Sequence, residues 1–273
     1  ALYANTTGGS NVAVGHQTLD ANTTGSSNTA VGSFALGANT TASSNAAFGY
    51  TALQSNTIGA NNTAVGNNTL VSNTTSGNNT AVGSLSLNVN TAGDNTAVGS
   101  HTLQANTTGN FNVAMGQAAL NANTTGASNT AIGQGALRDN STADANTALG
   151  TDALANCTTG AGNVSLGYKS LEDVTDQTGA IAIGYRAADS MPGGRGIFIG
   201  YDVMQGATGG HSRGLYMGYQ LESSAQNSTV DDEGIIAIGN HQANGKGNGT
   251  LFISCSTYSG SNGSVYQKNN SAD

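Results

Sequence analysis

The segment Asn28-Thr29-Ala30-Val31-Gly32-Ser33-Phe34-Ala35-Leu36-Gly37-Ala38-Asn39-Thr40-Thr41-Ala42-Ser43-Ser44 is a seventeen-residue unit from which most of the chain is copied. From Gly15 to Gly184, the Gly that closes its Asn-Thr-Ala-Val run recurs every seventeen residues, with one interval of sixteen between Gly83 and Gly99. A fixed period of this length predicts an all-β, parallel β-roll or β-solenoid in which each repeat forms one coil.

Each unit begins with a short strand, whose residues alternate between two faces. In the strand at residues 29–31, Thr29 and Val31 share one face, and we expect these larger residues to point into the coil. The other face carries Ala in nine successive units, with Ser165 as the first exception. A strand with a bulky face and a small apolar face is typical of burial on both sides, so the Ala row predicts contact with other copies of the chain. The residues expected at this oligomer interface are Ala13, Ala30, Ala47, Ala64, Ala81, Ala97, Ala114, Ala131, Ala148, Phe198, Tyr216 and Phe252.

The rest of the unit returns and closes the coil. We expect a second short strand at Ala35-Leu36, with Leu36 pointing inward to meet Val31. A turn such as Asn22-Thr23-Thr24-Gly25 follows, because Asn and Gly accept left-handed backbone conformations. Asn residues at the same place in successive coils can also form amide ladders.

Changes in the sequence of the repeat divide the chain into three parts. Residues 1–178 form the regular seventeen-residue β-roll. Residues 179–254 keep the frame with degenerate repeats and longer loops, as in Ile197-Phe198-Ile199-Gly200 and Leu251-Phe252-Ile253-Ser254. Residues 255–273 lose the pattern and are predicted to be a capping or exit segment. The chain opens in mid-repeat, so we expect further residues before Ala1.

Composition excludes several function classes. Among 273 residues, seven are Lys or Arg and the formal net charge is −8, which does not suit a nucleic-acid binder. No apolar run is long enough to span a membrane, so we expect no direct membrane insertion.

The head repeats of trimeric autotransporter adhesins resemble this chain at Ala180-Ile181-Ala182-Ile183-Gly184-Tyr185-Arg186-Ala187 and at residues 234–239. The Asn-Thr-Ala-Val-Gly units are similar to the variant of that repeat found in phage and large-virus tail fibres. The resemblance covers residues 1–254. It implies a left-handed roll, an intertwined or side-by-side homotrimer, and a role in surface attachment.

The sequence carries no pattern that indicates an enzyme, a metal site or a cofactor. The four His form no column, and neither His-x-x-x-His nor Cys-x-x-Cys spacing occurs. Asp173 with Asp176, and Asp231-Asp232-Glu233, could supply oxygen ligands to Ca²⁺, although solvated loops account for them better. Cys157 stands where other turns have Asn, and we interpret it as a tolerated substitution in a polar loop.

We therefore expect a structural and adhesive segment of a homotrimeric viral tail fibre, on the virion or at a cell surface, that mediates attachment to a host. The expected contacts with a host receptor, for which carbohydrate is the candidate class, are Tyr201, Tyr219 and Tyr258. One alternative is a cellular trimeric adhesin head. Another is an ice-binding β-solenoid, motivated by Thr pairs such as Thr23-Thr24 and Thr40-Thr41, because flat Thr arrays can order water.

Overall fold

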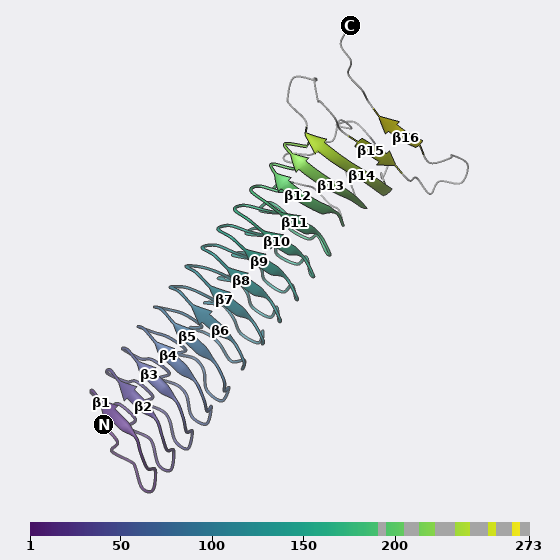
Figure 1. Ribbon diagram of the computed structural model, residues 1–273. Helices are drawn as coiled ribbons and strands as arrows, with labels where there is room; N and C mark the ends of the chain where they lie inside the picture. The colour runs from purple at the N-terminus through teal and green to yellow at the C-terminus, as the bar shows by residue number, and fades with distance from the viewer. Residues whose placement is uncertain (191–194, 205–212, 222–232, 241–250, 255–263, 268–273) are drawn as a thin grey trace. The chain divides into compact units, whose positions relative to one another are not determined.

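The computed structural model describes residues 1–190, 195–204, 213–221, 233–240, 251–254 and 264–267. The chain forms two compact units, Ala1–Asp144 and Ala145–Asp273. Within the described residues every regular element is a β-strand. Each strand of a unit pairs with the strand of the neighbouring coil, which confirms the predicted parallel β-solenoid of seventeen-residue coils (Figure 1).

Unit 1 contains eight three-residue strands that pair in chain order, all parallel and in register. The pairing sets Ala30 beside Ala13 on one side and beside Ala47 on the other. The strands are β1 (Val12–Val14), β2 (Thr29–Val31), β3 (Ala46–Phe48), β4 (Thr63–Val65), β5 (Thr80–Val82), β6 (Thr96–Val98), β7 (Val113–Met115) and β8 (Thr130–Ile132).

Unit 2 continues the same scheme with strands that become longer. Its parallel strands are β9 (Thr147–Leu149), β10 (Val164–Leu166), β11 (Ile181–Ile183), β12 (Ile197–Tyr201), β13 (Arg213–Tyr219) and β14 (Glu233–Asn240). The last two strands, β15 (Leu251–Ser254) and β16 (Ser264–Gln267), are antiparallel. The expectation that Leu251-Phe252-Ile253-Ser254 continues the coil frame is therefore wrong.

The two faces of each strand lie opposite to the prediction. Ala30 is fully buried inside the coil of its own chain, whereas Thr29 and Val31 point outward and are half-exposed. Leu36 is buried as predicted. In unit 1 the interior holds one large side chain per coil, contributed by the Leu of the return segment, and that leaves room for only a methyl group on the strand.

The Ala row is thus enclosed within one chain and offers no surface to a partner, which corrects its assignment to an oligomer interface. The row is fully buried from Ala30 onward, while Ala13 in the first coil is half-buried; the fully buried members are Ala30, Ala47, Ala64, Ala81, Ala97, Ala114, Ala131 and Ala148.

Ser165 shows what the Ala row faces. Its hydroxyl donates to the carbonyl of Ser170 at 2.8 Å, across the inside of the coil, and the two hydroxyls also contact each other. Where Ser replaces Ala on the strand, a second Ser replaces Ala on the return segment, so each buried hydroxyl has a partner.

In unit 2, aromatic residues replace Ala in the interior, and a smaller residue nearby makes room for each of them. Phe198 and Tyr216 occupy the Ala row of β12 and β13, and both are buried and stacked at 5.4 Å. Each is preceded two residues earlier by Gly196 or Gly214, where regular units have Asn; a Cβ on Gly214 would lie 2.6 Å from the Tyr216 ring. These residues fill the coil and do not form the expected interface surface. The side chain of Phe252 lies outside the described residues.

The predicted second strand at Ala35-Leu36 is also wrong, because the return segment is a series of turns. Phe34 and Leu36 both have positive φ, at 63° and 50°, a conformation that L-residues seldom adopt. Their amides nevertheless bond to neighbouring coils: Phe34 donates to His16 O at 2.9 Å and Leu36 to Ala52 O at 3.0 Å. The ladder of backbone hydrogen bonds offsets the strained conformation.

Two columns of buried Asn close the coils. In the first, the side-chain amide of Asn39 donates to Asn22 Oδ1 at 2.8 Å, which confirms the predicted amide ladder. The members bonded in this way within unit 1 are Asn5, Asn22, Asn39, Asn56 and Asn73, and then Asn90, Asn106, Asn123 and Asn140.

The second column is formed by the Asn that precedes each strand. Asn112 donates its backbone amide to Asn95 Oδ1 at 3.0 Å and its side-chain amide to Gly126 O at 2.9 Å. Asn123, from the first column, donates to the same carbonyl at 2.9 Å. One turn carbonyl thus accepts a hydrogen bond from an Asn of each column, and these two Asn belong to successive coils.

The Gly that ends each strand lies against the same Gly of the next coil. Gly66 has a φ of +138°, and a Cβ there would lie 2.7 Å from the carbonyl oxygen of Gly83. Both the backbone conformation and the close approach therefore require Gly at this position.

We expect Gly66→Ala to destabilise the protein by about 1–3 kcal/mol from backbone strain alone. The measurement is the midpoint of urea unfolding, followed by circular dichroism. The matched control is Gly9→Ala, because no atom lies within 4 Å of a Cβ built on Gly9. Equal midpoints for the two variants would contradict this account of the Gly column.

The sixteen-residue interval removes one residue from a turn and leaves the strands in register, since Thr80 still pairs with Thr96. The shorter turn instead removes one hydrogen bond from the Asn ladder. Asn90 donates to Ala92 O at 2.6 Å, two residues away, and Asn73 Oδ1 is buried without a hydrogen-bond partner among the described residues.

Inserting one Thr after Thr91 restores the regular turn length, so Asn90 can donate to Asn73 Oδ1. We expect the insertion to stabilise the protein by about 1–2 kcal/mol, because a buried acceptor gains its hydrogen bond. The midpoint of thermal unfolding reports the change. The same insertion after Thr107 lengthens a turn that is already regular and should lower the midpoint; a gain from both insertions would refute the explanation.

Candidate functional site

The outward side of the strands forms a surface that repeats with every coil of unit 1. It consists of the first and third residue of every strand, and we call it the outer strand face. Its members are Val12, Val14, Thr29, Val31, Ala46, Phe48, Thr63, Val65, Thr80, Val82, Thr96, Val98, Val113, Met115, Thr130 and Ile132. The first residues are mostly Thr and the third are all large and apolar. Six of the apolar members are between 37% and 57% exposed.

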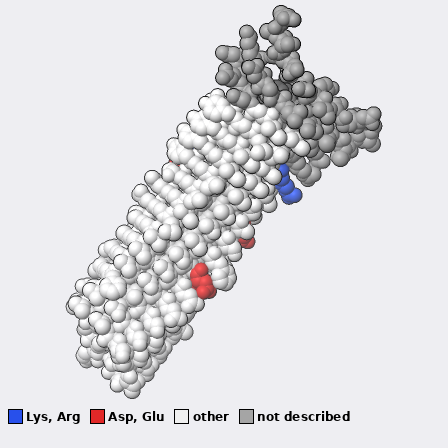
Figure 2. All heavy atoms as spheres, in the orientation of Figure 1, with Lys and Arg blue, Asp and Glu red and all other residues white. Residues whose placement is uncertain are grey.

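Charged side chains are absent from this face, since no residue of β1 to β8 is acidic or basic. Charges are also sparse on the side of the molecule seen in Figure 2. A flat parallel sheet normally has both faces covered, and a contiguous exposed apolar patch indicates an interaction surface. The outer strand face is therefore the strongest candidate for contact with a partner.

Sequence reasoning missed this face because it placed the larger strand residues inside the coil. A signal was present in the sizes of the side chains. The third strand position varies among Val31, Phe48, Met115 and Ile132, which differ widely in volume, and a closely packed interior does not tolerate that variation. The other strand face is uniformly Ala in unit 1, as a confined space requires.

Unit 2 carries a second distinctive surface, a tyrosine column made of Tyr168, Tyr185, Tyr201 and Tyr219. Each Tyr follows the Gly that ends a strand, and successive rings stack with centroids 5.2, 4.8 and 5.0 Å apart. Each residue is 41–48% exposed. The ring faces cover one another, so the column presents ring edges and phenol oxygens.

The predicted receptor contacts Tyr201 and Tyr219 belong to this column, together with Tyr168 and Tyr185, which the prediction omitted. Tyr258 lies outside the described residues. Aligning the residue after each strand Gly would have found all four members.

Charged residues flank the tyrosine column. Arg186 Nε lies 2.8 Å from Asp189 Oδ2 and 4.0 Å from Asp202 Oδ1. The hydrogen bond to Asp189 raises the pKa of Arg186, and burial raises the pKa of Asp202. Desolvation, with a contribution from Asp202, raises the pKa of Tyr201, so its hydroxyl is neutral at physiological pH and can donate a hydrogen bond.

The Thr pairs of the turns are partly used by the fold itself. The first Thr of each pair donates its hydroxyl to the next coil, as Thr23 does to Thr40 O at 3.0 Å and Thr40 to Thr57 O at 3.2 Å. The second Thr, such as Thr24 or Thr41, is exposed. Only one hydroxyl per pair is therefore directed to solvent.

Within the described residues, no group of three or more His, Cys, Asp or Glu side chains could hold a metal ion. In that same part of the chain, no helix has the length and apolar character needed to cross a membrane. Cys157 lies in the turn at the place of the Asn column, as the sequence predicts; like those Asn it is fully buried, and its Sγ lies 3.3 Å from Gly160 O.

No protein-family model, curated protein or solved structure matches this chain.

The burial of Cys157 predicts an unreactive thiol. Desolvation raises its pKa to about 11, so the nucleophilic thiolate is scarce at pH 8. We expect iodoacetamide to leave Cys157 unmodified in the folded protein at pH 8 and to modify it in urea, with peptide mass spectrometry separating it from Cys255. Rapid modification of Cys157 in the folded protein would contradict its burial.

Proposed function

We propose that this chain is a structural and adhesive segment of a homotrimeric fibre, of the viral tail-fibre type, which mediates attachment to a host surface. The observation that carries the proposal is the outer strand face. Its apolar residues repeat with every coil and leave a flat, uncharged surface unpartnered in a single chain.

Repetition makes this surface suitable for association between copies of the chain. Burying apolar area contributes about 25 cal/mol per Å², and each coil of unit 1 adds a large apolar residue to the contact, accompanied in five of the eight strands by Thr. Side chains of the same kind recur in register, so two copies can match along many coils with one backbone geometry. A homotrimer in which the outer strand faces meet around a common axis would bury all three surfaces.

The number three and the left-handed coil rest on the resemblance of the repeats to trimeric adhesin heads. The interface differs from the one expected from sequence, because the Val and Thr columns replace the Ala row. The same assembly suits a cellular adhesin head, which remains the alternative. Ice binding is less favoured, because the first Thr of each pair already donates to the backbone.

Receptor contact is assigned in this proposal to the tyrosine column, including Tyr201 and Tyr219. The column combines phenol oxygens that can donate and accept hydrogen bonds with exposed ring edges. Carbohydrate is the ligand class that such a surface suits. The neighbouring Arg186 and Lys169 side chains are engaged in ion pairs with Asp189 and Glu172.

Native mass spectrometry of the purified chain tests the assembly, and we expect a mass of three chains. Val65→Asp introduces a charge into the outer strand face and should shift the protein to monomers, because burying an unpaired carboxylate is costly.

The matched control is Val71→Asp, since Val71 lies on the return side of the same coil and is half-exposed. This variant should remain a trimer. A wild-type monomer, or equal behaviour of the two variants, would overturn the proposed interface.

A further inference from the structure

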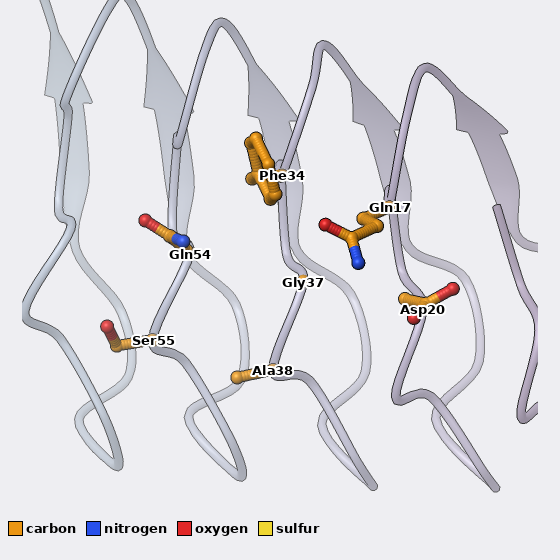
Figure 3. A pocket seen from close by; sticks show the side chains of 7 residues that line it. All are labelled: Gln17, Asp20, Phe34, Gly37, Ala38, Gln54 and Ser55. Carbon is orange, nitrogen blue, oxygen red and sulfur yellow. The ribbon is translucent and has the colours of Figure 1, made fainter.

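A shallow groove of about 540 Å³ lies on the return side of the first coils of unit 1, away from the outer strand face. Gln17, Asp20, Phe34, Gly37, Gln54 and Ser55 line it together with Ala38. Figure 3 shows these residues on three successive coils, with Gly37 on the middle one and the Gln17 and Gln54 side chains on the coils to either side. The volume falls in the range of about 300–1,000 Å³ that is typical of small-molecule sites.

The groove exists because Gly37 has no side chain. The same position carries Asp20 and Gln54 in the adjacent coils, and Val71 and Asn88 in the two that follow. Gly37 does not have a positive φ, and its Cβ would approach no atom more closely than 3.2 Å, at Phe34 O. The backbone therefore accepts a side chain here, and the Gly opens a gap between neighbouring coils that the fold does not require.

Phe34 forms an aromatic wall of this gap. Its ring is held edge-to-face by His16 at 5.4 Å and by Tyr50 at 6.0 Å, with interplanar angles of 80° and 89°. Edge-to-face contacts on both sides fix the orientation of the ring. A fixed, half-exposed ring beside an open gap offers a platform for the apolar face of a ligand.

The polar groups around the platform define the chemistry of that ligand. Gln17 and Gln54 each carry an amide that donates and accepts, Ser55 carries a hydroxyl, and the Asp20 carboxylate accepts only. None of the seven lining residues is basic. This set suits many neutral hydroxyl groups and disfavours an anion.

We propose that this groove is a binding site for a neutral pyranose sugar, whose apolar ring face packs on Phe34 while its hydroxyls bond to Asp20, Gln17 and Gln54. The site requires neither the outer strand face nor a homotrimer, and it is separate from the tyrosine column. An acidic sugar is excluded by the single negative charge of Asp20.

Saturation-transfer difference NMR on the full chain tests the site, with the methyl glycosides of glucose, galactose and N-acetylglucosamine as probes and sialic acid as the anionic comparison. We expect at least one neutral glycoside to bind and sialic acid not to bind. Gly37→Gln places in the gap the side chain that the next coil carries at this position, and should abolish the signal. Asp20→Asn should raise the Kd about tenfold, because a charged acceptor is lost.

Phe34→Asn removes the ring with a residue that tolerates positive φ, and Asn occupies the equivalent position at Asn68. This variant should also lose binding. Asp94→Asn alters an acidic residue outside the groove and should bind as the wild type does. Circular dichroism verifies that each variant is folded. Binding that survives Gly37→Gln and Phe34→Asn, preferential binding of sialic acid, or no binding of any neutral glycoside would each overturn the proposal.

Discussion

The width of the coil interior is the constraint on which the rest of this structure depends. Each coil of unit 1 closes in sixteen or seventeen residues and holds one buried Leu, so the strand opposite can place only a methyl group inside. Every departure is compensated within the same coil: Ser165 comes with Ser170, and Tyr216 comes with Gly214. The larger strand residues are consequently directed outward, and the narrow interior produces the apolar surface that we assign to assembly.

The period, the parallel solenoid and the Asn ladder could all be predicted from the sequence, because each depends on repetition and local chemistry. The direction of the strand faces could not be predicted by the usual rule that larger residues lie inside. That rule assumes an interior wide enough to hold them. The Ala30 position is constant, whereas the position of Val31, Phe48 and Met115 varies. This difference indicates that the Ala face points into the coil, provided that the constancy is interpreted as a sign of a narrow interior.

The return segment and the candidate sites were harder to predict for different reasons. Leu is not a residue type that indicates a positive φ, so the sequence does not predict the conformation of Leu36. That conformation follows from hydrogen bonds to a neighbouring coil. The sequence predicts two members of the tyrosine column, Tyr201 and Tyr219, and not the other two, because the degenerate repeats conceal their equivalence. The groove beside Gly37 exists because one of three successive coils lacks a side chain at this position. The residue type varies there from coil to coil, so the sequence repeat alone does not indicate a groove.

The shortened turn between Asn90 and Asn95 has a consequence for how such a chain can change. Losing one residue there leaves the strand pairing intact, and the damage is limited to one missing hydrogen bond of the Asn ladder beside the shortened turn. Gain or loss of a complete coil disturbs even less, because the new neighbours present the same interior and the same outer columns. Unequal recombination between nearly identical gene segments would therefore yield folded solenoids of different length. Length becomes a property that selection can adjust in steps of one coil, with no new packing problem to solve.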